Sequence, residues 1–377
     1  MKIALLGSGS GGHFTPLIAV ARELRRIAED EKLVSLELLL ISDEPVDEEI
    51  LQFEQITFRH FSSGKIRRYF SLKNIGDAIK TFFSVIYAFW VVYKEFPDVI
   101  FSKGGYVAFP ILFAARFYGI PILIHESDTV PGKVNIWSAT FARRIAISFP
   151  ETAIHFPEEK TAMTGIPIRS RVIGGNEEEA RTLFQLETHV PTLLVLGGSQ
   201  GAAPINDILL QAIERLIGRM QIIHQCGQDN YSDVLKNASV ILENSTHKKR
   251  YHPFAFLDED QLRNASHIAS VIVSRAGATA LYELAAWGIP SILIPLPHAA
   301  SDHQRKNAYA YARVGGGEVM EESNITPTVL TSQIIHLLED EALRSKMRAG
   351  AQRFARLDAA EKIAHEIIAL GLHGDIE

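Results

Sequence analysis

A glycine-rich loop near the start of the chain ends on a histidine, a combination of residue types that could do chemistry. The loop, residues 7–13 (GSGSGGH), follows the apolar run 2–6 and precedes a helical pattern that begins near Pro16. Glycines allow a backbone to approach an anionic ligand closely, and amides at the start of a helix favour negative charge. The loop matches neither the dinucleotide-binding fingerprint, since no acidic residue follows at the usual distance, nor a P-loop, since no Lys-Ser/Thr follows. We therefore expect an anion-binding loop at whose mouth His13 could act as a general base.

The elements that must position this loop are short apolar runs alternating with helical patterns, which is typical of parallel strands joined by crossover helices. Strands are expected at 2–6, 35–41, 98–101, 121–124, 192–196, 220–224, 270–273 and 291–294, and helices at stretches such as 16–28 and 278–287.

The pattern occurs twice along the chain. KIALLGSGSGG at the start is answered by TLLVLGGSQG at 192–201, and DVIFSKGG at 98–105 is answered by SVIVSRAG at 270–277. Two matched features in the same order predict two similar α/β domains, with the TGIP segment at 164–167 as the hinge between them.

Composition narrows the class of protein. The chain has 377 residues, 47% hydrophobic and 22% charged, and a net charge of −6 from 38 Lys and Arg against 44 Asp and Glu. This length favours two globular domains, and the acidic balance predicts no nucleic-acid partner. The single cysteine, Cys226, cannot form an internal disulfide. The first apolar run ends too early for a signal peptide, and the longest apolar stretch, 81–93, is too short to span a bilayer, so a cytoplasmic protein is expected.

Seven motifs carry a specific resemblance. They are GSGSGGHFTPLIAVA, SKGGYVAFP, HESDTVPG, TGIPIR, LGGSQGAAPIN, SRAGATALYELAAWGIPSILIPLP and DHQRKNA. Their order and spacing resemble the MurG family over roughly residues 1–350. Members of that family add N-acetylglucosamine to the undecaprenyl-linked muramoyl-pentapeptide precursor of peptidoglycan. The resemblance implies an α/β fold of GT-B type, with two Rossmann-like domains that each hold a parallel sheet and face each other across a cleft.

The resemblance also implies a division of labour along the chain. Residues 1–165 are expected to form an acceptor- and membrane-binding domain, and 166–350 a domain that binds the UDP-sugar. Residues 351–377 are expected to form a C-terminal helix that packs back on the first domain.

By the same resemblance, both glycine loops and several side chains contact the donor, UDP-N-acetylglucosamine. Glu283 would accept the ribose hydroxyls, Gln304 would bind the sugar hydroxyls, and the backbone of Leu257 would read the uracil edge. The remaining donor-binding candidates, which suit the diphosphate or the sugar, are Ser10, Gly11, Gly12, Arg169, Ser199 and Gln200.

On the acceptor side the resemblance implies contacts from Gly104, Gly105, Tyr106 and Asp128. The expected mechanism is a single displacement with inversion. His13 takes the proton from the C4 hydroxyl of N-acetylmuramic acid while that oxygen attacks the anomeric carbon, and Glu126 and Asp128 are the other candidates for the base. Loop amides stabilise the departing UDP, so neither a cofactor nor a metal is expected. The acidic triplet 258–260 is interpreted as a helix start rather than a metal site.

Three alternatives stay open. The chain could be another GT-B glycolipid transferase that uses a UDP-sugar, a sugar-nucleotide epimerase, or a non-catalytic subunit that anchors a partner to the membrane. The sequence also departs from the family, because Ser8 and Ser10 replace the usual Gly and Thr of the first loop, and Ala203 stands where the second loop usually carries Arg.

A basic stretch between residues 59 and 80 predicts contact with an anionic membrane surface. The stretch contains six basic residues and only one acidic residue, and apolar residues alternate with them in the sequence. This mixture suits peripheral attachment, on the cytoplasmic face of the bacterial cell membrane. The expected membrane contacts are Lys65, Arg67, Arg68, Tyr69 and Phe70, whereas the helix 81–93 is expected to be buried because it is apolar all round.

Overall fold

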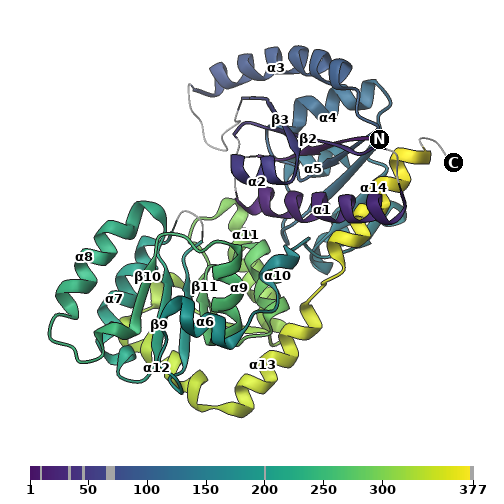
Figure 1. The fold of residues 1–377 in the computed structure, drawn as a ribbon. Coiled ribbons are helices and arrows are strands. Elements are labelled where there is room, and N and C mark those ends of the chain that lie inside the picture. The colour runs from purple at the N-terminus through teal and green to yellow at the C-terminus, as the bar shows by residue number, and fades with distance from the viewer. Residues whose placement is uncertain (9–10, 33–34, 45–46, 65–72, 199–200, 374–377) are drawn as a thin grey trace. The chain divides into compact units, whose positions relative to one another are not determined.

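The computed structural model describes residues 1–8, 11–32, 35–44, 47–64, 73–198 and 201–373. Its contacts divide the chain into two compact units (Figure 1). Unit 1 consists of Met1–Ile168 together with Arg356–Glu377, and unit 2 of Arg169–Ala355. Each unit is built on one parallel sheet, which confirms the predicted α/β class with two Rossmann-like units.

Unit 1 holds a seven-stranded sheet in the order β3-β2-β1-β4-β5-β6-β7. Its strands are β1 Lys2–Leu6, β2 Glu37–Ser42, β3 Ile56–His60, β4 Val99–Ser102, β5 Ile122–Glu126, β6 Arg144–Ile147 and β7 Thr161–Met163. Its helices are α1 Gly11–Asp30, α2 Glu48–Phe53, α3 Lys73–Glu95, α4 Ala108–Phe117, α5 Lys133–Ser138 and α14 Ala359–His373.

The strands of this sheet are buried on both faces, which explains why they appear in the sequence as continuous apolar runs. In β1, Ile3 and Leu5 pack with α1 and α14, and Ala4 and Leu6 pack with α3 and α4. Helix α14 lies along α1, although the two helices are at opposite ends of the chain (Figure 1). Ile363 and Ile367 of α14 are fully buried, so the end of the chain completes the core of unit 1.

Unit 2 holds a six-stranded sheet in the order β10-β9-β8-β11-β12-β13. Its strands are β8 Thr192–Leu196, β9 Gln221–Gln225, β10 Tyr251–Phe254, β11 Ala269–Ser274, β12 Ser291–Leu293 and β13 Gly317–Val319. Its helices are α6 Glu177–Phe184, α7 Ala203–Ile217, α8 Tyr231–Ile241, α9 Glu259–Ile268, α10 Ala278–Trp287, α11 His303–Arg313, α12 Pro327–Glu339 and α13 Glu341–Phe354. The first five strands of the sheet of unit 1, in the order β3-β2-β1-β4-β5, thus correspond to β10-β9-β8-β11-β12 in unit 2.

The predicted start of the first helix near Pro16 is wrong. Helix α1 begins at Gly11, five residues earlier, and Pro16 lies inside it. A proline at this place removes one backbone bond, whereas the buried side chains of Phe14, Leu17 and Ile18 hold the first turns against the sheet. His13 therefore belongs to the first turn of a helix rather than to the preceding loop.

Candidate active site

In unit 1, the candidate site is built where the strand order reverses direction. Strands β1 and β4 are neighbours, and the helices that follow them, α1 and α4, cover opposite faces of the sheet. The carboxyl ends of such strands leave a crevice at which open α/β sheets bind ligands. His13 and Lys103–Tyr106 follow β1 and β4, and Glu126–Asp128 lie at the end of β5 and just beyond it, so the predicted acceptor-side residues are gathered at one edge.

His13 is held by the segment that leads into its own helix. Its Nδ1 atom lies 2.9 Å from the hydroxyl oxygen of Ser8 and 3.4 Å from the Ser8 amide nitrogen. Burial, followed by the charge of Lys103, lowers the pKa of His13 to about 4, against the opposing effects of Asp128 and Asp43. The imidazole is therefore unprotonated at neutral pH, which is the form that a general base requires.

The loop after β4 approaches His13 closely. Gly105 has a φ of +88°, and a Cβ atom at this position would lie 3.5 Å from Cε1 of His13 and 3.4 Å from Oγ of Ser8. The amide of Gly104 donates a hydrogen bond to Oγ of Ser102, which shapes the same turn. Tyr106 donates its hydroxyl to Asp43 at the end of β2, and burial followed by this hydrogen bond raises the pKa of Tyr106.

The carboxylate of Glu126 accepts hydrogen bonds from residues that follow it in the chain. Its carboxylate accepts hydrogen bonds from the amides of Asp128 and Gly132, at 3.1 and 2.8 Å, and from the side chain of Asn135 at 2.9 Å. Burial is the main cause of its raised pKa, Asp128 adds to the effect, and the three hydrogen bonds oppose it. These contacts tie the segment from Asp128 to Gly132 to the end of β5.

Two neighbours of His13 were not assigned a role by the sequence analysis. Lys103 is only 3% exposed and contacts His125 and Ser127, and Ser8 contacts His13 directly. The signal for Lys103 was its place between a fully apolar strand and a Gly-Gly pair. A lysine there must be buried unless the loop turns it outward.

In unit 2, the order reverses between β8 and β11, and the candidate donor residues follow these strands. The glycine loop after β8 passes close to the segment that follows β9. Gly201 has a φ of +75°, and a Cβ atom at this position would lie only 2.2 Å from the Cys226 carbonyl oxygen. Ser199 and Gln200 lie outside the described residues, as does Ser10 of the first loop. Gly11 and Gly12 form the start of α1.

Arg169 and Glu283 are brought together. Glu283 is 9% exposed on α10, and its Oε1 atom accepts a hydrogen bond of 3.0 Å from Nη2 of Arg169. Nη1 of the same guanidinium lies 3.6 Å from Glu259. The Nε atom of Arg169 is buried and has no hydrogen-bond partner among the described residues, so this cation has capacity for a further acceptor.

The other donor candidates have protein partners. The amide of Leu257 donates to Oε1 of Gln225 at 3.1 Å, and Gln225 in turn donates to the Gly198 carbonyl in the second glycine loop at 3.1 Å. Gln304, near the start of α11, accepts a hydrogen bond of 3.0 Å from the amide of Leu296. Asp258 caps α9 and forms a capping box with Gln261, as expected from a helix-start cluster.

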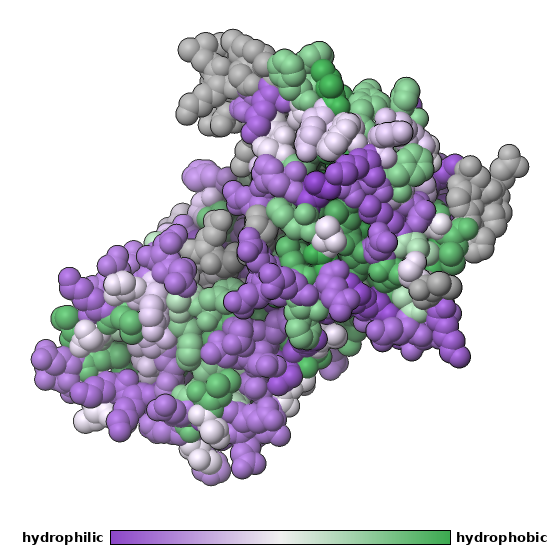
Figure 2. Space-filling model, turned by 45° about the horizontal axis from the view of Figure 1, so that its top comes forward, coloured by the Kyte–Doolittle hydropathy of each residue, from purple (hydrophilic) through white to green (hydrophobic). Residues whose placement is uncertain are grey.

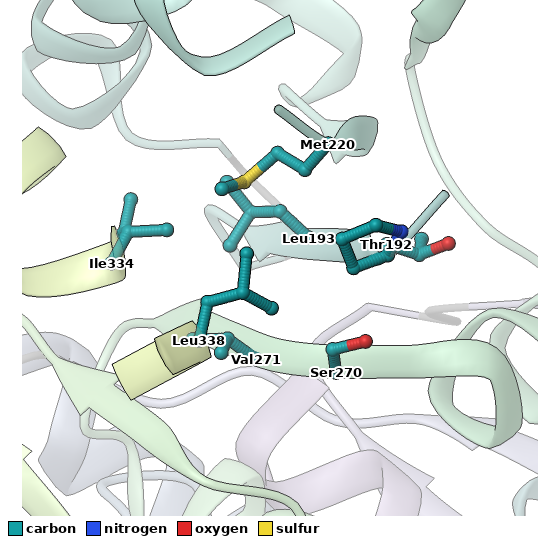
Figure 3. A pocket seen from close by; sticks show the side chains of 8 residues that line it. Thr192, Leu193, Met220, Ser270, Val271, Ile334 and Leu338 are labelled. Atoms are coloured by element: carbon teal, nitrogen blue, oxygen red, sulfur yellow. The ribbon is translucent and has the colours of Figure 1, made fainter. Parts of the chain in front are cut away.

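The cavity drawn in Figure 3 is a separate feature of unit 2. Apolar side chains such as Leu193, Met220 and Ile334 line it, together with Thr192 and Ser270. The latter two residues belong to the amino-terminal ends of β8 and β11. The cavity is therefore at the opposite edge of the sheet from the glycine loop, and no charged side chain lines it.

The predicted burial of the helix 81–93 is wrong. Helix α3 buries one stripe, which consists of Ser84, Ala88, Val91 and Val92. Its other side exposes large apolar side chains, for example 64% of Phe82 and 51% of Trp90, and Figure 2 shows hydrophobic residues at the surface over α3. A single apolar stripe suffices to pack a helix on a sheet. The apolar residues of α3 therefore form two surfaces, one packed on the sheet and one exposed.

We define the exposed apolar side chains of this helix as the α3 apolar face: Phe82, Phe83, Ile86, Tyr87, Trp90 and Tyr93. The membrane contacts expected at Lys65, Arg67, Arg68, Tyr69 and Phe70 lie outside the described residues. Within the described part of the chain, every helix is too short or too polar to cross a bilayer.

Known proteins resemble this chain over nearly its whole length. Residues 3–147 match the Glycosyltransferase family 28 N-terminal domain, and residues 192–363 match the Glycosyltransferase family 28 C-terminal domain. A Clostridium botulinum (strain 657 / Type Ba4) protein is 34% identical over 363 residues, which cover 94% of this chain and 98% of the relative. Its name is "UDP-N-acetylglucosamine--N-acetylmuramyl-(pentapeptide) pyrophosphoryl-undecaprenol N-acetylglucosamine transferase".

A Clostridium kluyveri protein of the same name is 33% identical over 368 residues, covering 97% of this chain and 98% of the relative. The crystal structure of Acinetobacter baumannii MurG is similar with a TM-score of 0.72 and 26% identity, and the match covers 98% of this chain and 100% of that one. The predicted resemblance to the MurG family and the predicted enzyme class, a glycosyltransferase, are confirmed. This chain is a member of glycosyltransferase family 28.

Proposed function

We propose that this protein transfers N-acetylglucosamine from UDP-N-acetylglucosamine to the C4 hydroxyl of N-acetylmuramic acid in a polyprenyl-pyrophosphoryl-linked MurNAc-pentapeptide. The observation that carries the proposal is full-length similarity, at 34% identity, to an enzyme named for this reaction. The geometry adds a second argument, because an unprotonated imidazole lies at the strand edge where open α/β sheets bind ligands.

In the proposed step, the C4 oxygen of the acceptor forms a bond to the anomeric carbon of the donor sugar. The bond between that carbon and the β-phosphate oxygen breaks, and both of its electrons leave with UDP. The proton of the C4 hydroxyl goes to the imidazole of His13. Attack opposite to the leaving group inverts the anomeric configuration, so an α-linked donor gives a β-linked product.

Glu126 is a positioning residue in this proposal rather than the base. A base must be able to accept the substrate proton, whereas both carboxylate oxygens of Glu126 already accept hydrogen bonds from the protein. Asp128, whose charge raises the pKa of His13, stabilises the imidazolium that forms when His13 takes the proton. Gly104, Gly105 and Tyr106 then shape the acceptor side of the site.

The donor is bound by unit 2 in this proposal. Glu283 accepts the ribose hydroxyls, and Arg169, released from its ion pair, turns its guanidinium toward the diphosphate. The backbone at Leu257 and the side chain of Gln304 contact the uracil and the sugar, and Ser199 and Gln200 contact the diphosphate.

The protein attaches to the cytoplasmic face of the membrane in this proposal, because a polyprenyl-linked acceptor must be met at the bilayer. The α3 apolar face supports attachment, since a helix face of this kind lies in the interface with its aromatic side chains among the headgroups. The basic stretch that precedes α3 adds attraction to anionic lipid.

The test is incubation of the full chain with UDP-N-acetylglucosamine and a short-chain lipid I analogue, followed by mass spectrometry and NMR of the product. Addition of one N-acetylhexosamine through a β-linkage is the expected result. Diacylglycerol replaces the acceptor in a parallel reaction, and a third reaction contains the donor alone. A glycosylated diacylglycerol would favour another glycolipid transferase, and a changed sugar nucleotide would favour an epimerase. Absence of any product would leave the anchoring subunit as the better explanation.

A further inference from the structure

Lys103 is buried directly after β4, at the centre of the candidate site of unit 1. Its Nζ atom lies 2.6 Å from Nδ1 of His125 and within hydrogen-bonding distance of Oγ of Ser127. The proposed mechanism gives this residue no role. Burial of a lysine is costly, because a desolvated ammonium loses its hydration, and buried lysines are usually paired with carboxylates. The direct partners of Lys103 are instead a ring nitrogen and a hydroxyl.

The direction of these hydrogen bonds follows from His125. Nε2 of His125 lies 2.9 Å from the carbonyl oxygen of Gly165, so Nε2 carries the proton and donates it. Burial, reinforced by the charge of Lys103, holds the pKa of His125 well below its usual range, so the ring is neutral. Its Nδ1 atom is therefore a pure acceptor, and Lys103 donates one N–H to it and can donate another to Ser127.

Ser127 precedes Asp128, and the turn between them is held from both sides. Glu126 holds the Asp128 amide on one side, and Lys103 holds the Ser127 hydroxyl on the other. Asp128 is close enough to His13 to raise the pKa of its imidazole, and Lys103 is close enough to lower it. The lysine thus contacts the residue beside Asp128 and acts electrostatically on the proposed base.

The titratable groups around Lys103 and His13 come from several elements. His13 lies on α1, Asp43 follows β2, and His125, Glu126 and Asp128 lie at the end of β5 and just beyond it. Burial lowers the pKa of Lys103 to about 7, against the opposing effects of Glu126 and Asp128. The charged form of Lys103 is therefore stabilised by Glu126 and Asp128, the carboxylates of the turn that Lys103 holds.

We infer that Lys103 is a positioning residue of the transfer reaction, whose buried ammonium holds Ser127, and with it the turn that carries Asp128, beside His13. The inference deepens the proposed function and rests on it. Lys103 does not touch the substrate in this account, but acts through Asp128. Without the lysine the turn loses its attachment at Ser127, and Asp128 no longer stabilises the imidazolium of His13.

The decisive variants are Lys103→Met, which removes the charge at similar length, and Ser127→Ala, which removes the hydroxyl and keeps the charge. Lys2→Met is the matched control, because Lys2 is also partly buried in unit 1 but lies at the amino end of β1 and pairs with Glu95. Two measurements are made on each protein. One is kcat and KM with UDP-N-acetylglucosamine and the lipid I analogue, and the other is the pKa of the His13 ring in the ligand-free protein, from NMR of labelled histidine assigned with His13→Gln.

For Lys103→Met we expect kcat to fall by about tenfold or more, while KM for the donor stays within about twofold. The pKa of His13 should rise from about 4, because a neighbouring positive charge is gone. Ser127→Ala should lower kcat and also lower the His13 pKa, because the released turn no longer holds Asp128, whose charge raises that pKa, and Lys2→Met should change neither. Adding Asp128→Asn to Lys103→Met should cost much less than Asp128→Asn costs alone, because both changes interrupt the same contact.

Wild-type kcat in both Lys103→Met and Ser127→Ala, or fully additive effects with Asp128→Asn, would overturn the inference while the proposed function stands. If Lys103→Met does not fold, the Ser127→Ala and Asp128→Asn pair decides by the same additivity criterion. If the wild-type protein forms no product, the proposed function fails, and the inference fails with it as a statement about catalysis. The NMR titration of Lys103→Met then still shows whether Lys103 acts on His13.

Discussion

The hydroxyl oxygen of Ser8 lies 2.9 Å from Nδ1 of His13. The Ser8 amide donates to the same ring nitrogen at 3.4 Å, so both polar groups of Ser8 contact Nδ1. Two contacts to one ring nitrogen restrict the rotation of the imidazole. Ser8 is therefore a positioning residue for His13.

Ser8→Ala should lower kcat by roughly 2- to 10-fold, which corresponds to the loss of one hydrogen bond of about 0.5–1.5 kcal/mol. The donor KM should not change, because Ser8 belongs to unit 1. Steady-state kinetics of the purified variant measure both values. Ser35→Ala, which changes an exposed serine of the same unit, is the control, and equal kcat values for all three proteins would show that Ser8 does not position His13 for catalysis.

His13→Ala should lower kcat by roughly 100-fold or more while UDP binding survives, because only the proton transfer is lost. In the wild type, the base is unprotonated above a pKa of about 4, so kcat/KM should fall as the pH decreases through about 4. Asp128 raises this pKa, so Asp128→Asn should move the acidic limb to lower pH. Recovery of activity on return to pH 7 controls for unfolding. A far larger loss in Asp128→Asn than in His13→Ala would exchange the two roles.

Glu283→Ala should raise the donor KM by about 10-fold or more, because each hydrogen bond from a ribose hydroxyl to a carboxylate contributes about 1.5–3 kcal/mol. Turnover should also fall, whereas the thermal midpoint should stay close to that of Arg169→Ala, which breaks the same ion pair. Glu259→Ala, which removes the 3.6 Å contact of Arg169, is the matched control. Calorimetric titration with UDP measures binding directly, and an affinity equal to the wild type would exclude Glu283 from the donor site.

Gly105→Ala should cost activity as well as stability. Its φ of +88° strains any side chain, at a cost of order 1–3 kcal/mol, and the added methyl group would lie in van der Waals contact with Ser8 and His13. Gly174 has a φ of +90° with no atom within 4 Å of a built Cβ, so Gly174→Ala isolates the strain. Denaturant unfolding should show similar losses for both variants, and kcat should fall only in Gly105→Ala. Full activity in both would mean that the close approach to His13 has no catalytic effect.

Membrane binding should depend on the α3 apolar face. Replacing Phe83 and Trp90 by serine should weaken sedimentation with anionic vesicles by at least about tenfold, since each large apolar side chain contributes about 1.5–3 kcal/mol when buried. This loss should persist at high salt. Glutamate at Lys65, Arg67 and Arg68 should instead weaken binding only at low salt. Leu235→Ser with Val240→Ser, on the exposed side of α8, is the control, and binding equal to it by every variant would place the attachment elsewhere.

Most central strands could be predicted because their residues are apolar on both faces of the sheet. The two glycine loops could be predicted because glycines follow directly after two of these strands. The strands β1 and β8 were predicted to the residue. Strand β6, which lies inside the sheet of unit 1 and has only four residues, was not predicted. The edge strands β3, β7, β10 and β13 were not predicted either, because an edge strand needs fewer apolar residues and two of these have three residues each. Strand β10 also contains Pro253, which is compatible with a strand only where one side has no partner.

The side-chain network of the site was less accessible to sequence analysis. A serine in a glycine loop is easily interpreted as a small residue, so the contact between Ser8 and His13 was not expected. Lys103 was not assigned a role because lysines usually reach solvent, and its burial depends on how β4 and β5 bring His125 and Ser127 around it. The exposure of α3 depends on which helices cover the sheet, and composition alone does not determine that.

The place of α14 in unit 1 sets an order for folding during synthesis. Residues 169–355 emerge from the ribosome before Ala359–His373, so unit 2 is a complete, continuous stretch while unit 1 still lacks a helix. At about 5–20 residues per second, that interval lasts roughly ten seconds or more. During it, the surface of α1 and β1 that Ile363 and Ile367 later cover remains open. Unit 1 is therefore incomplete, with an exposed apolar surface that is prone to aggregation, until the whole of unit 2 has been synthesised.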